Sequence, residues 1–125
     1  MQTITHAATW FEIPETNFER ARAFYGAIFG YELPSSPMGG YDMAFFRCDR
    51  EAVGGAVIHG EGLKPSADGT TVYLYGGDDL STVLDRVEGA GGKILLPKMK
   101  VTDEIGYIAT FIDTEGNKVS LHSRG

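Results

Sequence analysis

Apolar side chains recur at helical spacing in two segments of the chain, residues 17–29 and 79–90. In each segment they lie three, four or seven positions apart, so that they share one face of a helix. The first set is Phe18, Ala21, Phe24, Tyr25 and Ile28, and the second is Leu80, Val83, Leu84, Val87 and Ala90. Residues that can cap a helix N-terminus, 16–17 and 78–79, stand where the segments begin, and glycines follow the segments. The pattern predicts two amphipathic helices.

Short segments rich in β-branched and aromatic residues occupy most of the remaining chain. They are separated by glycine, asparagine and aspartate residues, which accept the backbone dihedrals that turns need. Residues 49–51 and 113–117 are predicted hairpin turns. We expect strands at residues 6–13, 42–48, 52–59, 71–75, 93–101, 107–112 and 118–123, and residues 31–33 are a candidate for another.

The order of strand, helix, glycine and several strands occurs twice along the chain. A shift of 62 residues places one helix start, Asn17, on the other, Asp79, and a shift of 64 places the turn at Asp49 on the turn at Asp113. This repeat predicts an α+β fold in which residues 1–125 form a single domain of two βαβββ modules. The modules cover about 1–62 and 63–125, with a linker near residues 60–70. We expect both modules to have the same strand order.

Composition limits the partners and the compartment. Eleven Lys and Arg residues against seventeen Asp and Glu residues give a net charge of −6, which repels phosphate backbones and argues against nucleic acid as a partner. The apolar runs are too short to cross a bilayer, and no signal-peptide pattern opens the chain. The single cysteine, Cys48, cannot form an internal disulfide. We therefore expect a cytoplasmic protein that does not associate with membranes.

Two motifs resemble a known family. Residues 11–14, 20–25 (RARAFY) and 28–30 resemble the first strand and helix of the vicinal oxygen chelate superfamily, which includes glyoxalase I, the bleomycin resistance proteins and the extradiol dioxygenases. Residues 113–123 (DTEGNKVSLHS) resemble its last hairpin, in the glyoxalase-related subgroup. The resemblance extends from about His6 to Arg124. It implies that the two modules form a cup-shaped mixed sheet with a ligand site inside, and that two chains pair as a homodimer.

The resemblance also locates the positions at which metal-dependent members carry their four ligands. Counting from the helix starts and from Gly116 gives Trp10, Ala56, Val72 and Ser120. This set contains one hydroxyl and neither an imidazole nor a carboxylate, which a divalent cation needs. We therefore expect no metal cofactor, and we expect these four residues to line the pocket instead. A displaced site using His59 and His122 would have no obvious third ligand.

Alternation along the first and last strands assigns side chains to two faces. The apolar residues Phe11, Ile13, Val119 and Leu121 are expected to pack under the helices. The other face then presents Trp10, Glu12, Ser120 and His122 to the cup, where Glu12 and His122 could act as a catalytic acid–base pair. In the alternative interpretation, Glu12 reaches solvent at the rim and His122 is a solvated residue at the strand end. Tyr107 flanks a turn at residues 103–106 that could close over a ligand.

Two functional hypotheses follow. The first is a glyoxalase-like enzyme, of lyase or isomerase type, which acts on a small carbonyl or hydroxy compound without the usual four metal ligands. The second is a non-catalytic protein that sequesters a small, antibiotic-type molecule against Trp10. In both hypotheses the partner is a small organic molecule.

Overall fold

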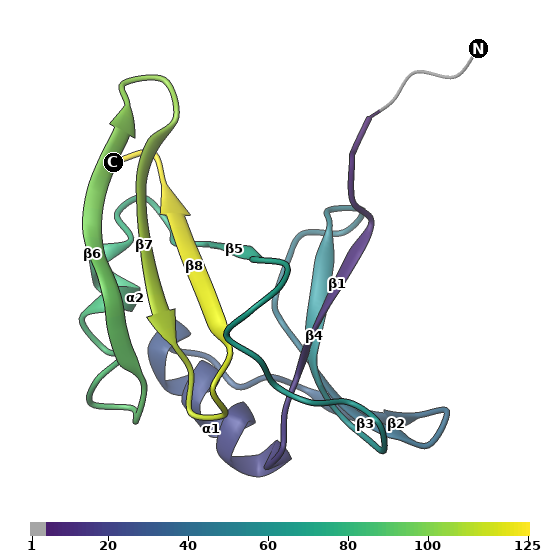
Figure 1. The fold of residues 1–125 in the computed structure, drawn as a ribbon. Helices are drawn as coiled ribbons and strands as arrows, with labels where there is room; N and C mark the ends of the chain where they lie inside the picture. The colour runs from purple at the N-terminus through teal and green to yellow at the C-terminus, as the bar shows by residue number, and fades with distance from the viewer. Residues whose placement is uncertain (1–4) are drawn as a thin grey trace.

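Two four-stranded sheets with the same strand order form the framework of the computed structural model, which describes residues 5–125 (Figure 1). The first four residues of the predicted 1–125 domain lie outside the described residues. The first sheet has the order β1-β4-β3-β2 and the second β5-β8-β7-β6. In both, the first strand of the module runs parallel to the last, and the other pairs are antiparallel. The α+β fold with two βαβββ modules and a shared strand order is therefore confirmed.

The elements follow the chain in the predicted order. In the first module they are β1 (Trp10–Pro14), α1 (Phe18–Phe29), β2 (Ser35–Met38), β3 (Tyr41–Phe45) and β4 (Gly54–His59). In the second module they are β5 (Tyr73–Tyr75), α2 (Ser81–Leu84), β6 (Lys93–Thr102), β7 (Gly106–Ile112) and β8 (Lys118–Ser123). None of the helices in the described part of the chain has the length and apolar character to cross a membrane.

The first helix begins and ends as its sequence predicts. The side chain of Asn17 accepts a hydrogen bond from the backbone N–H of Arg20 (3.1 Å), which satisfies one of the free donors at the helix start. Gly30 ends the helix with a left-handed backbone (φ 76°), a conformation that costs glycine little. The apolar face is buried over Ala21, Phe24, Tyr25 and Ile28.

The second helix is only partly regular. After Leu84 the chain continues in turns, and most hydrogen bonds here join residues three apart, as from Arg86 N–H to Val83 O (3.0 Å). Gly89 and Gly91, which weaken a helix, fall in this stretch. The apolar residues of the pattern are nevertheless buried: Leu80, Val83, Leu84 and Val87. The predicted buried face is confirmed, and the prediction of an α-helix over all of residues 79–90 is wrong.

The second strand lies later than the candidate segment 31–33. Leu33 is buried in the core instead, and β2 consists of four exposed residues that pair with β3 at the sheet edge. The apolar pattern does not mark this strand, because backbone hydrogen bonds hold it and neither of its faces is buried.

The core lies between the two sheets, around α1 (Figure 1). The ring of Tyr25 packs against Phe46, next to the first sheet, at 5.3 Å between centroids, and against Phe111 of the second sheet at 6.3 Å. Ile13, Val119 and Leu121 are buried in the same cluster, and Phe11 packs against it. This confirms which faces of the first and last strands pack under the helices. Because strand side chains alternate, the other face of each sheet, called the open face below, points away from this core.

Candidate functional site

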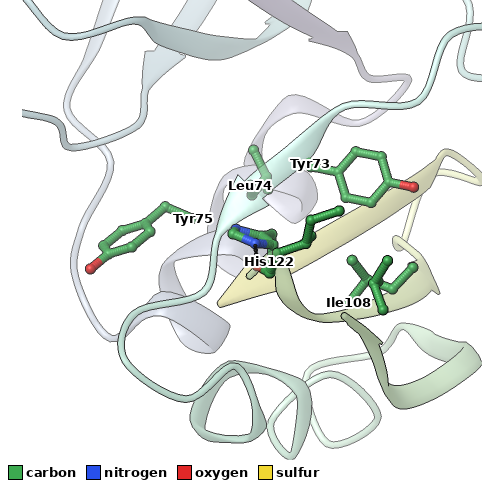
Figure 2. Close-up of a pocket in the computed structure, with 7 residues that line it drawn as sticks. Tyr73, Leu74, Tyr75, Ile108 and His122 are labelled. Atoms are coloured by element: carbon green, nitrogen blue, oxygen red, sulfur yellow. Dashed lines mark hydrogen bonds between the residues drawn. The ribbon is translucent and has the colours of Figure 1, made fainter. Parts of the chain in front are cut away.

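The open face of the second sheet carries an apolar pocket of about 520 Å³ (Figure 2). This volume falls within the range typical of small-molecule sites. Strands β5, β6, β7 and β8 and the turn after β6 contribute its walls. The lining residues are Tyr73, Leu74, Tyr75, Val101, Ile105, Ile108 and His122.

The Tyr-Leu-Tyr sequence of β5 produces one wall of this pocket. Leu74 is buried toward the core, whereas Tyr73 and Tyr75 are 53% and 76% exposed on the open face. In Figure 2 their two rings project to opposite sides of His122. The strand register places Tyr75 beside His122 of β8, and His122 beside Ile108 of β7. The neighbouring strands β5, β8 and β7 therefore place Tyr75, His122 and Ile108 side by side across the sheet.

The turn between β6 and β7 closes one end of the pocket. The ring Nε2 of His122 lies 2.6 Å from the backbone oxygen of Ile105, and the N–H of Ile105 donates to the hydroxyl of Thr102 (3.0 Å). A carbonyl oxygen can only accept, so Nε2 carries the hydrogen in this bond. When the ring is neutral, Nδ1 is then an acceptor. The turn predicted near a ligand thus contributes Ile105 to the lining.

The structure divides the residues predicted for the site between the two sheets. Trp10 and Glu12 lie exposed on β1 of the first sheet, where the indole N–H of Trp10 donates to the Glu12 carboxylate (3.2 Å). Ala56 is buried in a small cluster on that sheet. Ser120 and His122 lie on β8 of the second sheet. Within one chain, Glu12 and His122 are therefore not brought together.

Two other predicted pocket residues point toward the core. Val72 and Tyr107 are partly buried and pack against the cluster between the sheets. The ammonium group of Lys98 lies over the Tyr107 ring, 4.5 Å from its centroid. It also forms a salt bridge with the carboxylate of Asp79 (2.8 Å). The hydrogen bond from Lys98 lowers the pKa of Asp79 to about 2. Tyr107 thus belongs to a surface ion-pair arrangement beside β6.

Tyr73, Tyr75 and Ile108 were missed by the sequence analysis. The signal for the tyrosines is the alternation in β5, since Leu74 between them is the residue that a core-facing position requires. If Leu74 faces the core, both tyrosines must face the other side. Counting back from Asp79 selected Val72 instead. Val72 lies two residues before Leu74 and therefore points to the same, core-facing side.

The donor atoms at the four family positions do not fit a divalent metal. Ala56 and Val72 have no donor, and Ser120 is 1% exposed, with its hydroxyl hydrogen-bonded to Thr110 (2.8 Å). Among residues 5–125, no three His, Cys, Asp or Glu side chains lie together in a group that could hold a metal ion. His59 is not near His122 in the pocket: it lines a separate polar groove at the start of α1, and its Nδ1 lies 2.9 Å from the backbone oxygen of Glu15.

Sequence comparison finds glyoxalase-like relatives. A family model for the N-terminal part of bleomycin resistance protein-like proteins matches residues 8–47. A protein of Mycobacterium bovis named "Putative glyoxylase CFP32" is 27% identical over 118 residues, which cover 90% of this chain and 43% of that protein. This chain thus spans less than half the length of that curated relative. A "Glyoxylase-like domain-containing protein" of Didymella fabae is also 27% identical, over 90% of each chain.

Solved structures share the fold at lower identity. A glyoxalase/bleomycin resistance protein from Albidiferax ferrireducens T118 superposes with a TM-score of 0.70 at 16% identity, covering 96% of this chain and all of that one. Glyoxalase I from Zea mays gives a TM-score of 0.66 at 19% identity, covering 93% of this chain and 45% of the maize chain. The helix and hairpin motifs resemble the superfamily that appears in the names of these relatives. The solved structures have the same paired βαβββ modules. The chain is thus similar to proteins of the glyoxalase/bleomycin resistance superfamily, also called the vicinal oxygen chelate superfamily, and it has their fold.

Proposed function

We propose that the pocket on the second sheet binds a small, planar, mostly apolar molecule that carries a hydroxyl or N–H group. The exposure of Tyr73 and Tyr75 on either side of His122 is the observation that carries this proposal. Aromatic rings left open to water around a concave apolar surface are typical of a binding site, because a planar ligand can cover them. The net charge of −6 disfavours nucleic acid as the ligand.

His122 gives the pocket its polar anchor. Its Nε2 is held by the backbone oxygen of Ile105 (2.6 Å), which fixes the plane of the ring. Nδ1 of the neutral ring is then available to accept a hydrogen bond from the ligand. One hydrogen bond from a fixed ring orients a ligand, while the tyrosine rings and Ile108 contribute apolar contact.

The geometry supports binding more strongly than acid–base catalysis. The hypothesis of an acid–base pair needs both of its groups within reach of the same ligand. The carboxylate predicted to act with His122 is that of Glu12, which lies on the other sheet of the same chain. It accepts a hydrogen bond from the indole N–H of Trp10. His122 is thus the only titratable group besides the two tyrosines among the residues that line this pocket.

Naphthol and naphthalene form a matched pair of probes for this proposal, because they differ by one hydroxyl group. We expect naphthol to bind and to shift the NMR signals of Tyr73, Tyr75 and His122. Tyr75→Ala should weaken naphthol binding at least about tenfold, since burying one aromatic ring contributes more than 1.4 kcal/mol. Met38→Ala, which removes another exposed apolar side chain on the first sheet, should change it less than about twofold.

The role of His122 is tested by comparing the affinities for the two probes. His122→Ala should reduce the preference for naphthol over naphthalene, whereas Glu12→Gln should leave it unchanged. Equal binding of both probes to the parent protein, or shifts confined to the first sheet, would contradict the proposed site. Product formation from a panel of carbonyl and hydroxy compounds, abolished by His122→Ala, would replace the binding function with an enzymatic one.

We also propose that a second copy of the chain covers the open faces as a homodimer. Large apolar side chains are exposed on these faces: Trp10, Met38, Tyr73, Tyr75, Met99 and Ile105. Covering them with the same faces of another copy removes this area from water, and a two-fold arrangement lets the first sheet of each copy meet the second sheet of the other. In that arrangement Glu12 of the partner subunit would approach the pocket.

Light scattering at micromolar concentration tests the dimer. The expected mass is twice 13.5 kDa. Tyr75→Asp should shift the protein to the monomer, because it places a charge in the proposed interface. Glu88→Gln, at an exposed position after α2, should leave the mass unchanged. A monomeric parent protein would overturn the dimer and leave the naphthol experiment as a separate test of the pocket.

A further inference from the structure

A fully buried carboxyl group lies outside the pocket, at the end of β1. Glu15 is 0% exposed, and its backbone N–H donates to the oxygen of Ile58 (2.8 Å), which continues the pairing of β1 with β4. Neither oxygen of its side chain has a hydrogen-bond partner among the N–H and O–H donors of the described residues. An ionised carboxylate in this setting would lose its hydration and gain no hydrogen bond in return. The neutral, protonated acid is the form that the site accommodates.

A second buried carboxyl, Asp113, is 4% exposed and is joined to the end of β1 by Asn117, whose amide donates both to Asp113 and to the oxygen of Pro14, the residue before Glu15. Asp113 accepts four hydrogen bonds. Its Oδ2 accepts from the Tyr25 hydroxyl (2.8 Å) and the Asn117 amide (3.1 Å). Its Oδ1 accepts from the backbone N–H groups of Glu115 (2.8 Å) and Asn117 (3.0 Å). Asp113 is thus the carboxyl with four donors and Glu15 the one with none, so the proton of this pair belongs on Glu15.

The charged and titratable groups around Glu15 come from both modules. Burial raises the pKa of Glu15 to about 10, and the nearby charges of Asp113 and Glu115 act in the same direction, against Arg20. The Tyr25 hydroxyl donates to Asp113, and Nδ1 of His59 lies 2.9 Å from the backbone oxygen of Glu15.

These residues connect the first module to the last hairpin. Glu115 accepts from the backbone N–H of Asn17 (2.7 Å) and from the guanidinium of Arg20 (2.6 and 3.0 Å). The amide of Asn117 donates to the oxygen of Pro14 (2.8 Å). The β1–α1 connection and the turn at residues 113–117 are thus joined by a continuous polar network in which Glu15 and Asp113 are the buried centre.

We propose that Glu15 stays protonated at neutral pH and donates its proton in a hydrogen bond to Asp113, and that this carboxyl pair is a proton-dependent latch between the two modules. With the proton present, the pair carries one negative charge and one hydrogen bond. When the proton is lost, two carboxylates face each other away from water, and their repulsion favours release of the turn at residues 113–117 from the first module. The latch therefore holds at neutral and acidic pH and weakens as the pH rises.

The pH dependence of unfolding tests the latch. The pKa of Glu15 is about 10 in the folded chain and near 4.5 when unfolded, so between these values the folded state holds one more proton than the unfolded state. Stability then falls as the pH rises. In Glu15→Gln, the amide N–H replaces the acid O–H as donor at every pH. Between pH 6 and 9 we expect the folding equilibrium constant of the parent to fall about tenfold per pH unit relative to Glu15→Gln.

Glu19→Gln is the matched control, because Glu19 is an exposed glutamate four residues later, and its profile should run parallel to that of the parent. Parallel profiles for Glu15→Gln and the parent would overturn the proposal. NMR of the parent chain with carbon-13-labelled glutamate gives a second reading that does not depend on the variant folding. The Glu15 carboxyl signal should stay that of the neutral acid through pH 8, and titration of every glutamate below pH 6 would also overturn it.

Discussion

The two modules share a strand order, yet they differ in their helices and in the open faces of their sheets. The first has a twelve-residue helix capped at both ends, whereas the second has a four-residue α2 followed by turns. On the open face of the first sheet, Met43, Ala56 and Ile58 are buried with help from Phe45 and from Leu63 in the linker. On the second sheet the open face holds the pocket.

This difference shows which parts of the repeat are constrained. The strand order depends on the positions that face the shared core, and both modules keep apolar residues there. The open faces contribute little to that core, so their side chains can differ without a change of fold. Binding chemistry can therefore differ between the modules, and between relatives, on a common framework.

The largest expected effect comes from removing a ring of the shared core. Phe111→Ala should lower the free energy of unfolding by about 3–5 kcal/mol, because the fully buried ring packs against Phe24 and Tyr25 of α1. Urea unfolding followed by circular dichroism measures this loss. Tyr75→Ala, studied at a concentration where copies do not associate, should change it by less than about 0.5 kcal/mol. Equal losses would contradict the distinction between core face and open face.

An intermediate loss of stability is expected when the ion pair between Arg20 and Glu115, which joins the two modules, is broken. The side chain of Glu115 is fully buried, and that of Arg20 is half exposed. Burial would raise the pKa of Glu115, but the hydrogen bonds from Arg20, Asn17 and Thr114 outweigh it and lower that pKa below its ordinary value. At pH 7, Arg20→Ala should cost about 1–3 kcal/mol, because it leaves the buried carboxylate with fewer donors.

The pH dependence of this variant has a definite sign. Because the folded pKa of Glu115 is lowered, its contribution is present above the unfolded value of 4.5 and is lost as the pH falls through the folded value. The difference between the parent and Arg20→Ala should therefore shrink in acid. Lys100→Ala breaks the exposed pair with Asp103 and should cost less than about 0.5 kcal/mol at either pH. A pH-independent loss for Arg20→Ala would contradict the role of Glu115.

The smallest changes in stability are expected at two glycines, and they should have opposite signs. Gly30 ends α1, and Gly89 lies in the turns that follow α2. Gly30→Ala should lower stability by about 1 kcal/mol, because φ is 76° there and the new methyl group would lie 3.1 Å from the Arg86 guanidinium. Gly89→Ala should stabilise the chain by up to about 1 kcal/mol, since only the Arg86 carbonyl lies within 4.0 Å and φ is not positive. Thermal unfolding of both variants gives the comparison, and changes of the same sign would refute it.

The fold could be predicted from the sequence because its main determinants are local or periodic. Asn17 and Gly30 mark the ends of α1 by their own chemistry, and the parity of Ile13, Val119 and Leu121 identifies the core face. The irregularity of α2 could not be predicted, because packing keeps its apolar positions buried whichever hydrogen-bond pattern the backbone adopts.

The site was harder to predict, because it depends on how strands are brought together. Val72 was selected by counting along the chain, and an error of one residue moves a strand side chain to the opposite face. The separation of Glu12 from His122 follows from the placement of α1 between the sheets, which no local pattern reveals. The buried pair of Glu15 and Asp113 joins residues 98 positions apart, and neither residue stands out in its own segment.

The location of the core between the modules also has a consequence for proteolysis. Residues 66–70, in the linker, are exposed, while the cluster around α1 takes side chains from both sides of that linker. A protease cut at Asp68 or Gly69 would break the chain without removing any residue of that cluster. The two fragments should therefore stay associated after cleavage, and refolding from urea should change from a unimolecular reaction to one whose rate depends on fragment concentration.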